Sequence, residues 1–376
     1  MKKISLVAFL VVALATVFYA CSKSDGGDDG PGTGQGFDKS AMLASYADNL
    51  IIPGYTALQQ QLANLKTASD AFLAAPSEGT RATLKQAYTA AHLQYERVAA
   101  FQFGPAESAL LDLFVNFSGG LDYNFNTSGE LTGFSVDSNK IEQNITAGGY
   151  TFTNMVRSSF YSQGFPALNY LYFGPNAIDK LNADPVKRKQ YINDVLARFK
   201  ALVDKVAGDW PAYRAGFIAN TKTDVGSPIG SMINQFAYQM DLLKGPRIGW
   251  PFGKQSNGIV FASKTEAYFA GISGALAVEN ITSLKKIYTN NGNGKGMSDY
   301  LVALGKQSLN TDVLAQFDLV IARLQAIPDP LSASLTGNAA AVEAAYKEIQ
   351  KLLTLLKTDV PSATGVQITF MDNDGD

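Results

Sequence analysis

The chain is poor in cysteine, in histidine and in charge. Among its 376 residues there are one cysteine and one histidine, and charged residues make up only 17%. A single cysteine excludes a disulfide framework and a cysteine-rich zinc site, and a single histidine excludes a metal site built on two imidazoles of this chain. It also leaves one possible base for Ser-His-Asp catalysis, and the sequence has no G-x-S-x-G elbow.

The charge balance and the apolar content bound the class of protein. Lys and Arg number 31 against 33 Asp and Glu, a net charge of −2, so the basic surplus needed for phosphate contacts is missing and nucleic acid is not an expected partner. Hydrophobic residues make up 46%, enough to bury a core and to exclude disorder over most of the chain. A chain of this length is typically divided into two domains.

The first residues resemble the export signal of a bacterial lipoprotein. Lys2 and Lys3 precede an apolar run at residues 4–20, and this run is short for a mature membrane span. The run ends in a small residue, which is followed by the only cysteine, Cys21. Phe18 stands where such signals usually have leucine. We expect residues 1–20 to be a lipoprotein signal peptide and Cys21 to carry a lipid anchor; the alternative is an ordinary signal peptide with an incidental cysteine.

A tether is expected between this signal and the folded body. Residues 21–37 are rich in glycine and aspartate and cannot bury apolar area. Acidic residues directly after the cysteine resemble the export signals of surface lipoproteins, whereas a plain spacer would leave the protein in the periplasm. The predicted location is therefore the outer membrane, on its periplasmic face or at the cell surface.

The body of the chain shows the spacing of helices. Apolar residues recur every three or four positions in five segments, which are 84–98, 192–206, 229–243, 313–327 and 342–360. Asp184-Pro185 and Ser227-Pro228 are typical helix starts, with a capping side chain followed by proline. Alternating patterns are scarce, and residues 366–370 are the best strand candidate. The sequence predicts an all-α protein made of helical bundles.

Two parts of the chain share a pattern. Residues 58–95 and 317–353 both read as helical hairpins with similar apolar positions, which is consistent with a duplicated bundle. The stretch 208–211 contains glycine and proline and is the expected hinge. We therefore expect an N-terminal bundle at 38–208 and a C-terminal bundle at 209–376.

Few residues are candidates for chemistry. His92 and Glu96 lie four residues apart, so they share a helix face and could supply two metal ligands; the alternative is a pair that flanks the core. Lys244 and Arg247 lie in a turn restricted by glycine and proline, where they would meet an anion, a buried carboxylate or only solvent. Residues 372–376 resemble the opening of a calcium loop but stop before its glutamate, so a solvated tail is the alternative.

Several phrases of the sequence occur in an order known from one protein family. They are Tyr95-Glu96 followed by FQFGP at 101–105, the segment 164–173, the turn 244–253, the segment 266–273 leading into 283–288, and the ending 365–376. Together they resemble the imelysin family, also called peptidase M75-type proteins. The resemblance implies two helical bundles, a cell-envelope location and a link to iron uptake. One branch of the family is described as a metallopeptidase whose ligands come from a G-x-H-x-x-E motif.

This chain departs from that motif. The corresponding residues are Gly164, Pro166 and Asn169, and proline has no side-chain donor while asparagine is neither an anionic ligand nor a base. We therefore expect no metal, no cofactor and no catalytic residue at these positions. His92 is far upstream, and we expect it to lie away from this site.

These observations predict a binding protein rather than an enzyme. The expected pocket lies between the bundles and is lined by Glu96, Gly164, Pro166, Asn169, Lys244 and Arg247, which would bind by hydrogen bonds and charge. The predicted function is a non-catalytic envelope lipoprotein that binds a small ligand or an envelope protein in iron acquisition. The alternatives are a metal-dependent peptidase with a relocated site and a structural surface protein, the last of which predicts an interface without a pocket.

Overall fold

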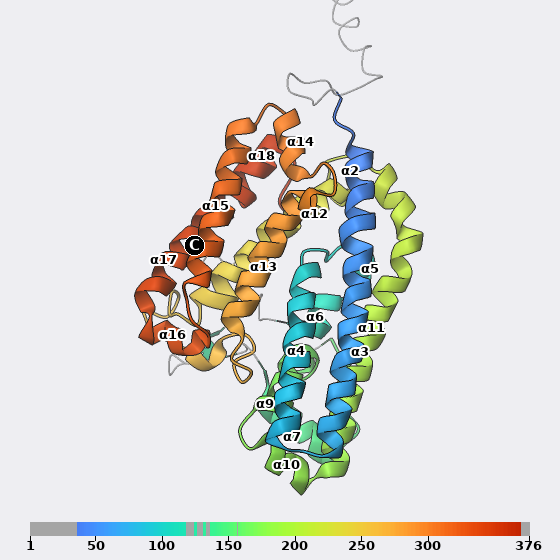
Figure 1. Cartoon of the computed structure of the whole chain (residues 1–376), viewed down its shortest axis with the longest axis vertical. Coiled ribbons are helices and arrows are strands. Elements are labelled where there is room, and N and C mark those ends of the chain that lie inside the picture. The colour runs from blue at the N-terminus through green and yellow to red at the C-terminus, as the bar shows by residue number, and fades with distance from the viewer. Residues whose placement is uncertain (1–35, 118–123, 126–130, 133–135, 156, 370–376) are drawn as a thin grey trace, which may run out of the picture.

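The computed structural model describes residues 36–117, 124–125, 131–132, 136–155 and 157–369. The fold is all-α, as predicted (Figure 1). The lipoprotein signal, Cys21, the tether up to residue 35 and the acidic ending at 372–376 lie outside the described residues. Within the described part, no helix is both long and apolar enough to cross a bilayer.

One group of helices contains the N-terminal part of the chain. Its long members α3, α4 and α11 lie side by side, and α7, α9 and α10 cover their far ends (Figure 1). The elements of this part are α2 (Lys39–Tyr46), η1 (Ala47–Ile51), α3 (Ile52–Ala74), α4 (Glu78–Val98), α5 (Pro105–Ser108), α6 (Leu111–Val115), α7 (Ser138–Ala147), α8 (Arg157–Phe160), α9 (Gly164–Phe173), α10 (Ala177–Ala183) and α11 (Pro185–Ala219).

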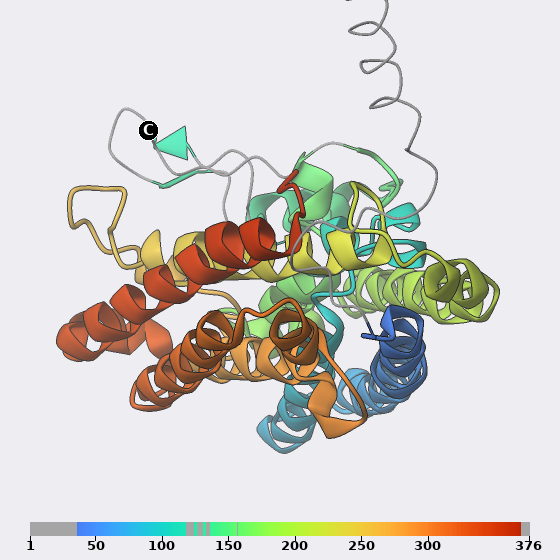
Figure 2. The same ribbon diagram turned by 90° about the horizontal axis from the view of Figure 1, so that it is seen from above.

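A second group contains the C-terminal part, with α12, α13, α15 and α17 as its long helices (Figure 2). Its elements are α12 (Pro228–Leu242), η2 (Leu243–Gly249), η3 (Ala262–Lys264), α13 (Ser273–Tyr288), η4 (Asn290–Gly292), α14 (Met297–Ala303), α15 (Gln307–Gln325), α16 (Leu331–Gly337), α17 (Ala339–Thr354), η5 (Leu355–Asp359) and α18 (Val360–Thr364). Helix α13 packs against α4 and so joins the two groups.

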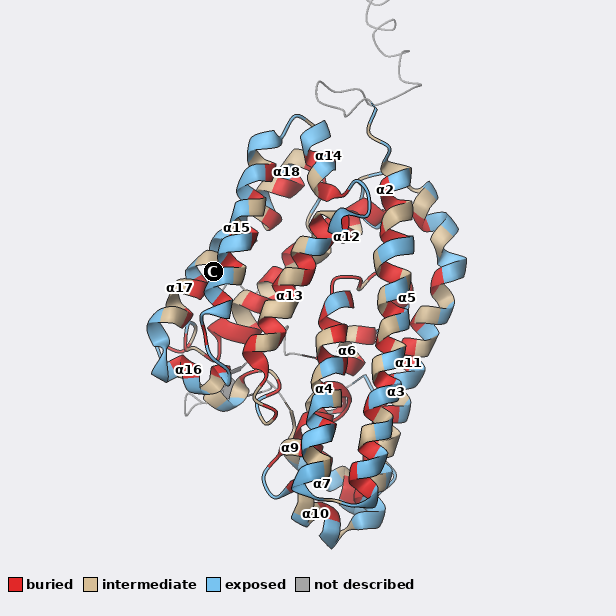
Figure 3. Cartoon of the chain, in the orientation of Figure 1, coloured by how far each residue is buried: buried red, intermediate tan, exposed pale blue. Residues whose placement is uncertain are grey.

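Local sequence explains where these helices begin. The Asp184 side chain accepts a hydrogen bond from the Lys187 backbone N–H at the start of α11, and Ser227 accepts one from Gly230 at the start of α12. Each cap satisfies a backbone donor that the first turn leaves unpaired. All five predicted apolar segments are helical, apart from residues 326–327 after the end of α15, and they bury their stripe, with the buried residues facing inward between the helices (Figure 3).

The hinge predicted at 208–211 is wrong. Helix α11 runs unbroken from Pro185 to Ala219 with Pro211 inside it, so the expected boundary at 208/209 cuts through a helix. Trp210 is fully buried and packs edge-on against Phe103 and Phe217, at ring-centroid distances of 6.2 and 5.4 Å. This aromatic packing stabilises the helix across a proline that costs it one backbone hydrogen bond.

The strand predicted at 366–370 is also wrong, because residues 366–369 form no strand and Phe370 lies outside the described residues. The segment is held by a side chain instead: the Thr369 N–H donates to Asn234 Oδ1 at 2.7 Å, and Asn234 Nδ2 donates to the Gln367 carbonyl at 2.9 Å. The strands among the described residues are β1 (Asn124–Phe125) and β2 (Leu131–Thr132), which pair antiparallel.

Both predicted hairpins form. Helices α3 and α4 pack against each other in the first group, and α15 and α17 do so in the second, with the short helix α16 inserted between them. Whether they descend from one duplicated unit stays a prediction.

Candidate functional site

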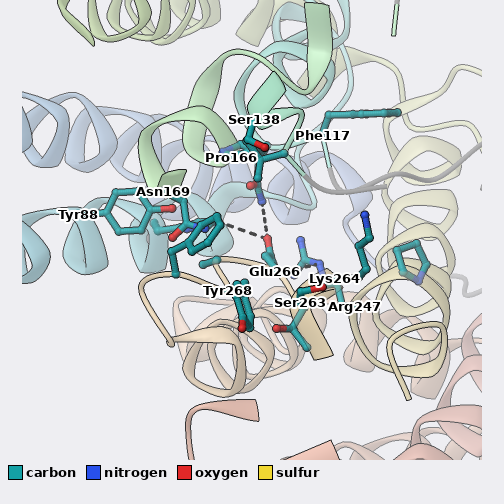
Figure 4. Close-up of a pocket in the computed structure, with 17 residues that line it drawn as sticks. Tyr88, Phe117, Ser138, Pro166, Asn169, Arg247, Ser263, Lys264, Glu266 and Tyr268 are labelled. Atoms are coloured by element: carbon teal, nitrogen blue, oxygen red, sulfur yellow. Dashed lines mark hydrogen bonds and ion pairs between the residues drawn. The ribbon is translucent and has the colours of Figure 1, made fainter. Parts of the chain in front are cut away.

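A cavity of about 220 Å³ lies where elements of the two helix groups meet (Figure 4). Its wall combines polar and aromatic side chains from α4, α7, α9, η2, the residues after α6 and the irregular segment before α13. The lining residues are Tyr88, His92, Asn116, Phe117, Val136, Ser138, Pro166, Asn169, Pro246, Arg247 and residues 263–269.

Arg247 is the central cation of this wall. It lies in the π-helical turn η2, which directly extends α12, and only 4% of its side chain is exposed. Its Nη1 donates to Glu96 Oε2 at 2.7 Å, and its Nε lies 3.5 Å from Glu266 Oε2. Burial lowers the pKa of Arg247, but the nearby carboxylates of Glu266 and Glu96 raise it by more than burial lowers it. The pKa therefore lies above its ordinary value, and the guanidinium is charged. Of the three alternatives given for the cations of the 244–253 turn, the buried carboxylate applies to Arg247.

Glu96 lies directly behind Arg247 and is fully buried. Its Oε2 also accepts a hydrogen bond from Asn280 Nδ2 at 2.8 Å, while its Oε1 has no hydrogen-bond partner among the described residues. Burial raises the pKa of Glu96, and the nearby Arg247 only partly offsets this effect. One carboxylate oxygen is therefore left in a low-dielectric environment without a donor, which is costly.

Glu266 comes from the irregular segment before α13 and faces the cavity (Figure 4). Its Oε1 accepts a hydrogen bond from Asn116 Nδ2 at 2.8 Å and lies 3.5 Å from His92 Nε2. Burial alone would raise the pKa of Glu266, but Arg247 and His92 outweigh burial and lower the pKa to about 2. Glu266 is thus a carboxylate at neutral pH.

His92 contradicts the expectation that it lies away from this site. It is 1% exposed and lines the cavity, and its ring stacks on Phe165 of α9 at 3.9 Å with an interplanar angle of 4°. Tyr88 contacts its edge at 5.6 Å. Sequence separation was the wrong guide, because this stacking joins α4 directly to α9. Neither ring nitrogen of His92 has a hydrogen-bond partner in the described part of the chain.

The residues at the motif positions do not offer metal ligands. Pro166 and Asn169 both line the cavity, but the Asn169 Oδ1 is already used as the acceptor for the Ala270 N–H at 2.9 Å. That hydrogen bond fixes the segment that carries Glu266. A metal held by these two positions therefore does not fit this chain.

Three of the six expected pocket residues, Glu96, Gly164 and Lys244, do not line the cavity. Gly164 begins α9 with a φ of +63°, and a Cβ there would lie 2.2 Å from the Val115 carbonyl oxygen, so it is a site of close backbone approach. Lys244 is partly buried in η2 and is not part of the cavity wall. The expected set thus divides: Pro166, Asn169 and Arg247 line the cavity, and Glu96 lies behind Arg247.

Two residues of the site were missed. Asn116 carries no sequence signal, and Glu266 belongs to the segment 266–273, which was noted only for its resemblance. The structure brings Glu266 to the His92–Glu96 pair, and one ligand atom from each of the three residues lies within 4.8 Å of the others. This is a group of imidazole and carboxylate donors of the kind that holds divalent metals.

Comparisons with known proteins agree with this fold. Among curated proteins no match was found. A solved structure from Parabacteroides distasonis, assigned as an iron-regulated protein A precursor, superposes with a TM-score of 0.69 at 18% identity and covers 91% of this chain and 97% of that one. An imelysin-like protein from Psychrobacter arcticum gives 0.69 at 16% identity, covering 89% and 97%. The sequence profile of the Imelysin family (peptidase M75) matches residues 51–358, so the chain belongs to the imelysin family.

Proposed function

We propose that this protein is a non-catalytic, lipid-anchored binding protein of the cell envelope that serves iron acquisition and takes up its ligand in the cavity between the two helix groups. The observation that carries the proposal is the cavity itself, whose wall contains the buried polar side chains His92, Asn169 and Arg247. A purely structural surface protein would have no reason to keep charges and imidazole around an internal space, because burying them costs free energy.

The link to iron is supported by family membership and by the relative assigned as iron-regulated. The lipid anchor is supported by the sequence around Cys21. The role in iron acquisition and the lipid anchor are therefore both parts of the proposed function.

A peptidase with a relocated site is the alternative, and the group formed by His92, Glu96 and Glu266 favours it. Hydrolysis would also need a free general base beside a bound water. Asp112, a further buried carboxyl group close enough to interact with Glu266, accepts a hydrogen bond from the Tyr95 hydroxyl at 2.8 Å and does not line the cavity. Among the described residues Glu266 is the one carboxylate in the cavity wall, and it is already engaged by Asn116, Arg247 and His92, so binding is the better-supported role.

The proposal is tested in the bacterium that encodes the protein, by uptake of radioactive iron under iron restriction. Deletion of the gene should lower uptake, and the wild-type gene should restore it. Ser263 lines the cavity and is exposed at its edge, so Ser263→Trp should block access and fail to restore uptake. Ser308→Trp places the same bulk on the exposed face of α15 and is the matched control.

The result that would overturn the proposal is equal uptake with and without the gene, or restoration by Ser263→Trp to the level of the control. Release of peptide fragments by the purified full-length protein, lost in Glu266→Gln, would favour the peptidase.

A further inference from the structure

We propose that His92, Glu96 and Glu266 form a binding site for a divalent first-row transition-metal ion, with one imidazole and two carboxylates as ligands. The site names the ligand of the binding role proposed above and rests on it. It differs from the G-x-H-x-x-E arrangement, because none of its ligands comes from α9: two come from α4 and one from the segment before α13.

The geometry is close to that of a formed site. The three donor atoms lie within 4.8 Å of one another, whereas donors around an ion at about 2.1 Å are about 3–4 Å apart. Closing this difference requires each donor atom to move by about 1 Å or less. His92 and Glu266 line the cavity, so an ion that enters the cavity reaches both directly.

The unpartnered atoms point to a missing partner. The Nδ1 of His92 and the Oε1 of Glu96 are buried and have no hydrogen bond within the described ranges, and the Nε2 of His92 has only its contact with Glu266 Oε1 at 3.5 Å. Native proteins leave few such atoms, and each one needs an explanation. A cation between imidazole and carboxylate satisfies a ring nitrogen and the free oxygen at once.

The charges also favour a cation. Glu96 and Glu266 carry two negative charges when ionised, and Arg247 contacts both but supplies only one positive charge. Asp112 adds a further buried carboxyl group near Arg247 and Glu266. The site is therefore short of positive charge, which either a proton on Glu96 or a metal ion can supply.

The surroundings hold the ligands in the orientation that a metal needs. Asn116 fixes one oxygen of Glu266, while Arg247 and Asn280 fix Oε2 of Glu96 and leave its Oε1 available. Phe165 fixes the plane of His92 by stacking. Hydrogen bonds and packing of this kind around ligands raise metal affinity by restricting the ligands before binding. The donor set of one nitrogen and carboxylate oxygens suits Fe²⁺, Mn²⁺ or Zn²⁺ better than Mg²⁺.

The test uses the full-length protein, purified in detergent and stripped with a chelator. Calorimetric titration with Mn²⁺, Zn²⁺ and, without oxygen, Fe²⁺ should show one site per chain, and Mg²⁺ should bind far more weakly. His92→Phe keeps the stacking ring but removes both nitrogens, and Glu266→Gln keeps the shape; each should weaken binding at least tenfold. Glu142→Gln is the matched control, because Glu142 is also held by an arginine, Arg188, but lies outside the cavity.

X-ray absorption at the metal edge gives an independent reading. It should show one imidazole in the first coordination shell of the wild type and none in His92→Phe. Circular dichroism of each variant establishes whether it is folded. If His92→Phe does not fold, the presence or absence of the imidazole signal in the wild type decides whether His92 is a ligand. Absence of stoichiometric binding, or binding unchanged in both variants, would overturn the proposal.

The two proposals fail differently. If Ser263→Trp abolishes iron uptake but the purified protein binds no metal, the binding role stands and the metal site falls. If metal binds through His92 but uptake does not depend on the gene, the site stands and the role in iron acquisition falls.

Discussion

Replacing Arg247 with methionine tests whether this guanidinium stabilises two buried carboxylates. The substitution keeps much of the side-chain volume but removes the charge next to Glu96 at 2.7 Å and Glu266 at 3.5 Å. At an effective dielectric constant of about 20, these separations correspond to gross attractions of about 6 and 5 kcal/mol. Most of this is offset by the cost of burying the charges, but removing one partner leaves the others uncompensated.

We expect Arg247→Met to lower the free energy of unfolding by about 3–5 kcal/mol at pH 7.5, the usual cost of breaking a buried ion pair. Burial already raises the pKa of Glu96, and loss of Arg247 raises it further. An acid whose pKa is raised on folding destabilises the protein above its unfolded pKa, near 4.5, and this penalty disappears as the pH falls towards that value. The deficit of the variant should therefore shrink at pH 5.

The assay is urea unfolding of the metal-free protein, followed by far-ultraviolet circular dichroism at both pH values. Arg214→Met is the control, since Arg214 pairs with Asp48 on the surface and its loss should barely change the midpoint. Adding Glu96→Gln to Arg247→Met should restore part of the stability at pH 7.5. The reasoning is refuted if Arg247→Met is as stable as the control, or if its deficit is the same at pH 5 and pH 7.5.

Three further predictions concern single positions. In the metal-free protein, the pKa of Glu266 is lowered to about 2, so its carboxylate should make the wild type more stable than Glu266→Gln by up to about 3 kcal/mol above pH 4.5. This difference should disappear as the pH falls towards 2, and acid unfolding curves measure it. Gly164→Ala should cost at least about 2 kcal/mol, since φ is +63° and the new methyl would meet the Val115 carbonyl, and a thermal shift no larger than that of a surface substitution would contradict this. Asp184→Ala should cost about 1 kcal/mol in urea unfolding through loss of the α11 cap, with no change in metal binding.

The sequence was sufficient for most of the helices. Their apolar stripes and caps are local signals, and Asp184 and Ser227 cap their helices as predicted. The hinge prediction was wrong because glycine and proline weaken a helix only by a few kcal/mol, and the burial of the Trp210 side chain outweighs that loss. The strand prediction was wrong because the backbone of the alternating segment 366–369 is bound by a side-chain amide, that of Asn234, and not by another strand.

The candidate site was only half predictable. Arg247 was expected in a restricted turn. It is buried because η2 extends α12 as a π-helix, and no local sequence pattern indicates this extension. Glu266 lies in a long irregular stretch without periodicity, so nothing in the sequence places it near α4. Its position depends on contacts between distant segments, such as the hydrogen bond from Ala270 to Asn169.

The change at the motif positions has a physical counterpart elsewhere in the site. Asn169 holds the segment that carries Glu266, and Phe165, next to Pro166, provides the surface on which His92 stacks. Helix α9 thus positions two donors that it does not itself supply. Because a metal ion depends on the spacing of donor atoms and not on the helix that carries them, loss of imidazole and carboxylate from one helix does not by itself remove a binding site. What must survive is the convergence of donors on one buried point, and in this chain α4 and the segment before α13 provide it.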